Sequence, residues 1–367
     1  MRKRRFVIIS LVLVAVLVFA LTACGGGGAA PAEDGTAPTE TTPVEGEASA
    51  EATGNATYKM KASTYLPESD DTYPLLLDYC DKVRERTNGD VDITVYPAES
   101  LGPYDQTFEE TMRGTIEFGF NAIPATKDAR LEAGTLPGLV GDFDQVEKFL
   151  SSDGTVFKTT DAALDDLNVK LLGWIFGGHA NLVFAGEPEP GYADPAIAKK
   201  ATIRVPSSVA SYGELIKALN YKTASLNGSE VYSSLQTGII DGTIGQSNAF
   251  VLSGYSDVVK TIVDMKVMIS PDSIFINKDL FESMPAEYQQ IIQEEADILT
   301  STMIKYQADQ EKVIEEELGK LGITVIHLTP EERALVEGVV VAKVWPFFEE
   351  RISKEFVDSL KAEFGID

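Results

Sequence analysis

The sequence reads IRVPSSVASYGELIKALNYKTASLNGSEVYSSLQTGIIDG over residues 203–242. Apolar runs and helical spacing in this stretch predict strands and helices that alternate. They are a strand ending at Pro206, a helix over residues 212–219, a strand over 221–225, a helix over 230–236 and a strand that starts at Gly238. This order is typical of an α/β fold. Small ligands in such folds bind beyond the carboxyl ends of the strands.

Arg204 is the first candidate ligand-binding residue, because it lies near the end of the first predicted strand. Its guanidinium presents a fork of N–H donors that matches a carboxylate. The alternative is a structural ion pair, since the chain carries 57 acidic residues and most ion pairs only connect surface elements. Spacing alone favours this structural alternative.

Composition narrows the classes of function. The chain has 367 residues, of which 44% are hydrophobic and 24% are charged, and this is enough for two domains with their own cores. A formal net charge of −26 disfavours binding to nucleic acid, and an anionic ligand would need a locally positive site. Two histidines and two cysteines argue against a zinc site, so no metal is expected.

The N-terminal segment predicts export and lipid attachment. Residues 1–23 combine a basic start with an apolar run that is short for a membrane-spanning helix and typical of a signal peptide. The sequence Leu-Thr-Ala-Cys, which ends at Cys24, resembles a bacterial lipobox and implies cleavage before Cys24 and lipid attachment to its thiol. The alternatives are an ordinary cleaved signal or an uncleaved anchor. Residues 24–57 predict a disordered tether, because they are rich in Gly, Ala, Pro, Thr and Glu.

The segment after the tether predicts a first α/β lobe. Its expected elements are strands over residues 58–65, 90–96 and 116–120 and helices over 72–86 and 104–112. An alternating order at this spacing favours a mainly parallel sheet, so the loops after the first and third strands would open at one edge together with Arg204. Leu66, Asp70 and Asn121 are therefore candidates to line a ligand site.

A glycine pair marks a candidate crossing between two lobes. Residues 168–176 have the pattern of a buried strand and lead into Gly177, Gly178 and His179, where glycine permits changes in φ and ψ. His179 could donate to a ligand, or it could be a structural histidine bonded to a backbone carbonyl. Trp174 is a further candidate, although tryptophan in such a strand more often belongs to the core.

Two polar residues and a long helix complete the pattern. Gln246 and Asn248 are candidate hydrogen-bonding partners of a ligand, and ordinary surface residues are the alternative. Residues 285–318 carry apolar residues at helical spacing, which predicts a helix of roughly 50 Å that crosses both lobes. Two helices with an unmarked break are the alternative. Further helices are predicted over 331–350 and 354–364.

Short motifs in the chain are similar to segments of a known family. They are IRVP at 203–206, SEVYSSLQTGIIDG at 229–242, and YPAESLG, RGTIEFGF and GTLPGL upstream. Together they resemble the solute-binding proteins of tripartite ATP-independent periplasmic (TRAP) transporters. The resemblance covers the chain from Tyr58 onward.

The resemblance implies a two-lobed clamshell, like that of periplasmic binding proteins, in which the long helix spans both lobes. Lobe I would comprise residues 58–178 and 272–312, and lobe II residues 179–271 and 313–367. Arg204 would clamp the carboxylate of a small organic acid, and the protein would deliver this ligand to the membrane permease subunits from the extracytoplasmic face. We expect a lipid-anchored monomer that carries no cofactor.

Three departures from the family pattern bear on specificity. A second arginine that is usual after the crossing is replaced by His179 or Ala180, residues 243–246 read TIGQ where asparagine is common, and Gly228 replaces a bulky residue. These departures put specificity for sialic acid and C4-dicarboxylates in doubt. The single anchoring arginine favours a monocarboxylate, with space for an apolar or aromatic body.

Two other classes of function compete with this prediction. One is a substrate-binding lipoprotein of an ABC transporter or of a sensor, and the other is an extracytoplasmic enzyme. The sequence contains no Gly-x-Ser-x-Gly elbow, no HExxH and no P-loop, and it offers no Cys/His pair for nucleophilic catalysis. These features weigh against an enzyme.

Overall fold

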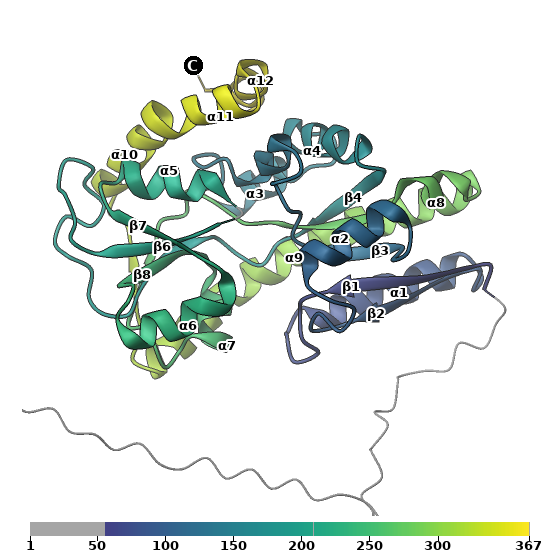
Figure 1. The fold of residues 1–367 in the computed structure, drawn as a ribbon, viewed down its shortest axis with the longest axis horizontal. Coiled ribbons are helices and arrows are strands. Elements are labelled where there is room, and N and C mark those ends of the chain that lie inside the picture. Colours follow the sequence, from purple (N-terminus) through teal and green to yellow (C-terminus); the bar gives the residue numbers. More distant parts are fainter. Residues whose placement is uncertain (1–55, 208, 367) are drawn as a thin grey trace, which may run out of the picture. The chain divides into compact units, whose positions relative to one another are not determined.

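The computed structural model describes residues 56–207 and 209–366, which form two mixed β-sheets with helices around them (Figure 1). The first sheet has the strand order β2-β1-β3-β10-β4. Its strands are β1 (Tyr58–Thr64), β2 (Val91–Tyr96), β3 (Phe118–Asn121), β4 (Val169–Ile175) and β10 (Asp272–Asn277). β1 runs parallel to β2 and β3, whereas β10 lies antiparallel between β3 and β4. The predicted signal peptide and Cys24 lie outside the described residues.

The second sheet has the strand order β11-β9-β5-β8-β6-β7. Its strands are β5 (Asn181–Phe184), β6 (Thr202–Pro206), β7 (Lys222–Leu226), β8 (Gly242–Gln246), β9 (Thr261–Asp264) and β11 (Thr324–His327). β6 runs parallel to β7 and β8, and β11 runs parallel to β9. β5 is antiparallel to both of its neighbours, β8 and β9. The α/β fold class predicted from the sequence is confirmed.

Helices cover both sheets. The α-helices are α1 (Tyr73–Arg86), α2 (Tyr104–Arg113), α3 (Phe143–Phe149), α4 (Thr155–Asp165), α5 (Ala210–Ala218), α6 (Gly228–Thr237), α7 (Asn248–Gly254), α8 (Lys278–Ser283), α9 (Ala286–Lys320), α10 (Pro330–Val339), α11 (Trp345–Arg351) and α12 (Lys354–Phe364). A 3₁₀ helix, η1 (Ala129–Thr135), precedes α3, and a π-helical turn, η2 (Val340–Val344), joins α10 to α11. None of the helices in the described part of the chain has the length and apolar character to cross a membrane.

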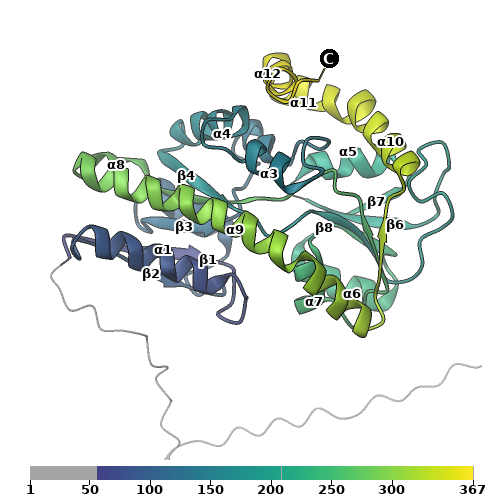
Figure 2. The ribbon, with the colours of Figure 1, turned by 180° about the vertical axis from the view of Figure 1, so that it is seen from behind.

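Three connections join the two sheets within the described residues: residues 176–180 between β4 and β5, residues 265–271 between β9 and β10, and the helix α9. α9 contacts α1 and β4 on one side, and it contacts α7 and β11 farther along. Figure 2 shows this helix running past both sheets. Its 35 residues form one unbroken α-helix, so the predicted continuous helix is confirmed and the alternative of two helices is wrong.

The C-terminal helices pack against elements from both halves of the fold. α12 contacts α4, which covers β4 of the first sheet, whereas α11 and η2 contact α5, which covers β6 of the second sheet. Trp345 Nε1 donates a hydrogen bond to the carbonyl oxygen of Pro137, 2.9 Å away. The predicted boundaries of the two lobes stay predictions.

The helix α6 shows how local sequence sets the geometry near the predicted site. The side chain of Asn227 accepts a hydrogen bond from the backbone of Glu230, and Glu230 Oε2 accepts one from the Asn227 N–H at 3.1 Å, which together form a capping box. Gly238 ends the helix with a left-handed φ of 71°. The prediction of a strand starting at Gly238 is therefore wrong, and β8 begins only at Gly242.

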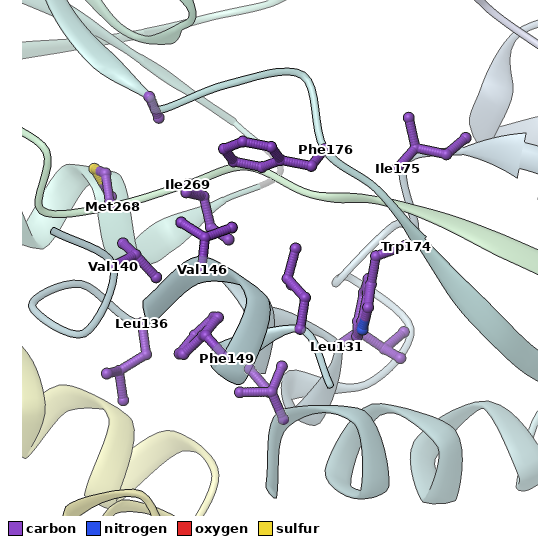
Figure 3. Close-up of a cluster of buried hydrophobic side chains, with 14 of the residues drawn as sticks. Leu131, Leu136, Val140, Val146, Phe149, Trp174, Ile175, Phe176, Met268 and Ile269 are labelled. Carbon is purple, nitrogen blue, oxygen red and sulfur yellow. The ribbon is translucent and has the colours of Figure 1, made fainter. Parts of the chain in front are cut away.

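A hydrophobic core surrounds the two crossing segments. In Figure 3, apolar side chains of η1 and α3 lie beside the end of β4 and the second crossing. The cluster includes Leu131 of η1, Phe149 of α3, and Phe176, Met268 and Ile269 of the crossings, all of which are buried. Burial of each such side chain contributes about 1.5–3 kcal/mol to folding. The backbone that joins the sheets is thus held by the core on this side.

Candidate ligand-binding site

Arg204 lies in the middle of β6, where its backbone pairs with Ala224 of β7 and Thr243 of β8. Its side chain is buried, with 5% of its surface exposed. The Nε group donates a hydrogen bond to the carbonyl oxygen of Leu226, 3.0 Å away. Among the described residues, no carboxylate lies within ion-pair distance of the guanidinium. The structural ion pair that spacing alone favoured is not formed with any of these residues.

The environment of Arg204 favours an anionic ligand. Burial lowers the pKa of the guanidinium, because a charged group is disfavoured where water is excluded. A buried cation is costly unless an anion and further hydrogen bonds compensate it. Since Nε is bonded to Leu226, the two terminal amino groups are oriented as a fork that a carboxylate can bridge.

Two tyrosines that the sequence analysis did not single out lie near Arg204. The hydroxyls of Tyr255 and Tyr104 act against the effect of burial on the pKa of Arg204. Tyr255 follows α7, whereas Tyr104 begins α2, which contacts β3 and β10 of the first sheet. Tyr104, whose helix packs on the first sheet, thus belongs to the electrostatic surroundings of Arg204 in the second sheet. The available signal for Tyr104 was its position at a helix start, directly after Gly102 and Pro103.

Gln246 and Asn248 lie on either side of the turn that joins β8 to α7. Gln246 Oε1 accepts a hydrogen bond from the hydroxyl of Thr243 at 3.0 Å, so it lies next to the strand position that pairs with Arg204. Asn248 Oδ1 accepts one from Asn181 Nδ2 at 2.9 Å. Asn248 lines a small cavity beside α9, to which Arg204 does not contribute. Gln246 therefore lies beside the strand position that pairs with Arg204, whereas Asn248 lies in a different cavity.

His179 has the contacts of a structural histidine. Its ring Nε2 lies 2.7 Å from the carbonyl oxygen of Val140, and a hydrogen on Nε2 makes this a hydrogen bond. The ring packs edge-to-face against Phe143 and Phe176. Burial lowers the pKa of His179, which keeps the imidazole neutral. The side chain does not replace the cationic group of a second arginine.

Three predicted residues of the first sheet are held by local contacts. Asn121 is buried, its Oδ1 accepts a hydrogen bond from the Tyr65 N–H at 2.8 Å, and its Nδ2 donates to the carbonyl oxygen of Ser63 at 3.0 Å. Asp70 Oδ1 accepts from the backbone N–H of Thr72 at 2.8 Å and orders the turn before α1. Leu66 is a buried core residue. None of these contacts involves Arg204.

Trp174 lies in the hydrophobic core, near Leu131 in Figure 3. Its ring packs edge-to-face against Phe157 with the ring centroids 6.3 Å apart, and only 3% of the residue is exposed. Its indole N–H has no hydrogen-bond partner among the described residues. The position matches the core alternative that the sequence analysis left open for this residue.

A hydrogen-bonded pair at the second crossing was not predicted from the sequence. The hydroxyl of Tyr65, directly after β1, donates to Asp272 Oδ2 at 2.5 Å. Burial raises the pKa of Asp272 to about 7, the negative charge of Asp70 adds to this rise, and the bond from Tyr65 opposes it. Burial also raises the pKa of the Tyr65 hydroxyl. The pair connects the end of β1 to the start of β10, directly after the second crossing.

The described residues contain no cluster of three or more His, Cys, Asp or Glu side chains arranged to hold a metal ion. The candidate site consists of the buried guanidinium of Arg204 and the Leu226 carbonyl that its Nε meets, with Tyr255 and Tyr104 in its electrostatic surroundings. Such a set can hold a carboxylate by hydrogen bonds and charge.

Comparisons with known proteins identify relatives of this chain. Residues 62–350 match the model of the family described as bacterial extracellular solute-binding protein, family 7. A solute-binding protein of Albidiferax ferrireducens is 23% identical over 238 residues, which cover 62% of this chain and 66% of that protein.

Two solved structures share the fold. A TRAP periplasmic solute-binding protein from Ochrobactrum anthropi has a TM-score of 0.74 and 24% identity, over 84% of this chain and 95% of that one. Another, from Desulfovibrio salexigens with bound orotic acid, has a TM-score of 0.74 and 22% identity, over 84% of this chain and 99% of that one. The match of the family model across most of the described chain confirms the resemblance drawn from the sequence, and the chain belongs to family 7 of the bacterial extracellular solute-binding proteins.

Proposed function

We propose that the protein is the extracytoplasmic solute-binding component of a TRAP transporter and that it captures a small organic acid through Arg204. The observation that carries this proposal is a buried guanidinium with no carboxylate partner among the described residues. In a folded protein such a cation needs an anion that arrives from outside. Membership of the solute-binding family supplies the biological setting, in which the membrane permease subunits receive the ligand.

The site favours a monocarboxylate with a flat or apolar body. Arg204 offers one carboxylate clamp, and His179 is neutral and bonded to Val140. A Cβ atom added at Gly228 would meet nothing within 4 Å, so this position leaves space beside the start of α6. The relative from Desulfovibrio salexigens holds orotic acid, which combines a carboxylate with a flat ring. Of the two polar candidates, Gln246 would add a hydrogen-bonding group beside Arg204, whereas Asn248 lines a separate cavity.

Binding would work by closure of two lobes. Lobe I, residues 58–178 and 272–312, and lobe II, residues 179–271 and 313–367, would rotate about the segments near Gly178 and Ser270. A ligand that touches Arg204 on one side and the Tyr104 side on the other has its full set of contacts only in the closed state, which shifts the population towards that state.

The protein would act at the outer face of the cell membrane, anchored by lipid on Cys24 and tethered by residues 24–57. This part of the proposal rests on the sequence pattern, since Cys24 lies outside the described residues. Metabolic labelling with a radioactive fatty acid should label the wild type and leave Cys24→Ser unlabelled. We further propose a monomer without a cofactor or catalytic activity, as the family of solute-binding proteins supports.

Native mass spectrometry of protein purified without refolding tests the ligand class, because a tightly bound acid is retained through purification. A thermal-shift panel of monocarboxylates, C4-dicarboxylates and sialic acid then ranks the candidates. We expect monocarboxylates to raise the melting temperature most. A larger rise with dicarboxylates or sialic acid would overturn the proposed ligand class, and no response to any organic acid would overturn the proposed function.

A further inference from the structure

A small, partly open cavity lies beside the first crossing, away from Arg204. Its volume is about 30 Å³, which is room for about one water-sized group. The residues that line it and that matter here are Gly178, Asn181, Ser247, Asp264, Gln307 and Glu311. They come from the first crossing, from β5, β9 and the turn before α7, and from α9. Two of the three connections between the sheets, the first crossing and α9, therefore contribute to the cavity wall. The wall also includes β9, the strand that leads into the second crossing.

Two oxygen atoms in this wall lack a hydrogen-bond partner among the described residues: Asn181 Oδ1 and Asp264 Oδ1. Their residues are 2% and 3% exposed. The antiparallel ladder of β5 and β9 ends at the pair Leu182 and Val263; Asn181 and Asp264 adjoin this end, and both line the cavity. Both atoms only accept hydrogen bonds. Buried acceptors without a partner are rare in folded proteins and point to an unseen occupant.

The other polar side-chain atoms of Asn181 and Asp264 already have partners. Asp264 Oδ2 lies 3.1 Å from His327 Nδ1, and Asn181 Nδ2 donates to Asn248. Lys266, two residues after Asp264, is paired with Glu311 at 2.6 Å. His179 is neutral, and its Nε2 hydrogen is bonded to Val140. Lys266 is therefore not free to meet the two orphaned oxygens, and it compensates the charge of Glu311, which also lines the wall.

We propose that this cavity binds a single hard monovalent cation, with Na⁺ as the best fit. Asn181 Oδ1 and Asp264 Oδ1 would bind it, and neutral oxygen groups of Ser247 and Gln307 lie in the same wall to complete its shell. Hard cations prefer carboxylate, amide and hydroxyl oxygens of this kind. Among the described residues no cluster of three or more His, Cys, Asp or Glu side chains is arranged to hold a transition metal, and His179 in the wall is bonded through Nε2 to Val140. The bound cation would fix the first crossing, β9 and α9 relative to one another.

The test measures the melting temperature of ligand-free protein, so it does not depend on the organic acid. The full chain is stripped of ions and titrated with NaCl, KCl, CaCl₂ or choline chloride at matched ionic strength. We expect a saturable rise with Na⁺ that exceeds the rise with choline. A saturable response to K⁺ or Ca²⁺ in place of Na⁺ would keep the cation site but overturn the assignment to Na⁺. Equal curves for all four salts would overturn the proposal and leave a water molecule as the occupant.

Two variants, one that removes a carboxylate from the cavity wall and one that adds a carboxylate, make the test more specific. Asp264→Asn removes the charged ligand and should abolish the specific response. Asn181→Asp adds a second carboxylate and should tighten cation binding about tenfold, because affinity follows the ligand charge; it also keeps the test decisive if Asp264→Asn does not fold. His327→Gln is the matched control, since it changes the outer partner of Asp264 and leaves the cavity oxygens in place. If Asn181→Asp melts at a lower temperature than the wild type, and no cation raises that temperature more than choline does, the proposal is overturned. Any of these negative results leaves the role of Arg204 intact.

Discussion

Glu132 illustrates how a single residue joins distant parts of the chain. It is 1% exposed, and its Oε1 accepts a hydrogen bond from Arg351 Nη2 of α11 at 2.8 Å. The other carboxylate oxygen has no partner among the described residues. The charge of Glu132 is therefore compensated mainly from the C-terminal helices.

Replacing Arg351 by alanine should leave this carboxylate buried without its cation. Loss of one partner from a fully buried pair costs about 3–5 kcal/mol, and we expect about 2 kcal/mol here because the Arg351 side chain is 34% exposed. Urea unfolding gives the free energy directly. Arg113→Ala is the control, since Arg113 is exposed and its pairs with Glu109 and Glu110 should contribute little. Equal stabilities of wild type and Arg351→Ala would contradict this reading of Glu132.

Asp272 should make stability depend on pH. Its pKa is raised to about 7 in the folded protein, whereas an unfolded aspartate titrates near about 3.9. The folded state therefore holds its proton more tightly, and the free energy of unfolding should fall as pH rises from about 4 to about 7 and then level off. Asp272→Asn should remove this part of the slope.

The pH series is measured by urea unfolding of the wild type and Asp272→Asn. Asp257→Asn is a matched control, because Asp257 is exposed and also accepts a hydrogen bond from a tyrosine, Tyr232. The control should keep the slope of the wild type. A parallel slope in Asp272→Asn would show that Asp272 does not bind its proton more tightly in the folded state.

At the scale of single residues, the sequence predicted the chemical role of a residue better than it predicted which residues that residue contacts. Arg204 could be chosen because its strand and its charge are both local features. The contacts of His179 with Val140 and of Asn121 with Ser63 span 39 and 58 residues, and no local pattern encodes them. Tyr104 and Asp272 were missed for the same reason, since their importance depends on the packing of the two sheets.

Among the secondary-structure elements, α9 was the easiest to predict, because 35 residues of helical spacing leave little ambiguity. The helix predicted over residues 331–350 is less regular. It consists of α10, the π-helical turn η2 and α11, and Pro346 lies at the start of α11. A proline has no N–H to donate, so the backbone bonds rearrange before it.

Thr300 connects α9 to the edge strand of the first sheet. Its hydroxyl accepts a hydrogen bond from the Trp174 N–H at 2.9 Å and lies 3.0 Å from the Trp174 carbonyl oxygen. Thr300→Val keeps the shape but leaves the edge N–H of β4 without a partner, which should cost about 1–3 kcal/mol. Thr302→Val, at an exposed position of the same helix, is the control. Chemical denaturation of both variants checks this, and equal stability of Thr300→Val and the wild type would contradict it.

For the whole molecule, we predict compaction on ligand binding. The segments near Gly178 and Ser270 are short, and Gly178 has a φ of 105°, which glycine adopts without strain. Rotation there would close the lobes with little change inside either one. Small-angle scattering should show a smaller radius of gyration at saturating ligand, and Arg204→Ala at the same ligand concentration should show the open profile. An unchanged wild-type profile would remove the clamshell mechanism.

The sequence predicted the overall architecture through its alternating elements and its family motifs, whereas the strand order needed the structure. β5 and β10 are antiparallel to their neighbours, and each directly follows a crossing between the sheets. A strand that enters a sheet from the other half of the fold carries no local sign of its direction. β10 also separates β3 from β4, although its residues lie about a hundred positions farther along the chain than β4.

Calorimetric titration of the identified organic acid into the wild type, Arg204→Ala and Arg204→Lys tests most directly whether Arg204 holds the ligand. Alanine leaves the bound carboxylate desolvated and unpaired, so affinity should fall by roughly 30-fold to several thousand-fold, or about 2–5 kcal/mol. Lysine should restore affinity only in part, because an ammonium keeps the charge without the planar fork. Circular dichroism should show that both variants fold, and Arg113→Ala should bind like the wild type. Near-equal affinities of the three proteins, or an unfolded Arg204→Ala variant, would contradict the proposed role of Arg204.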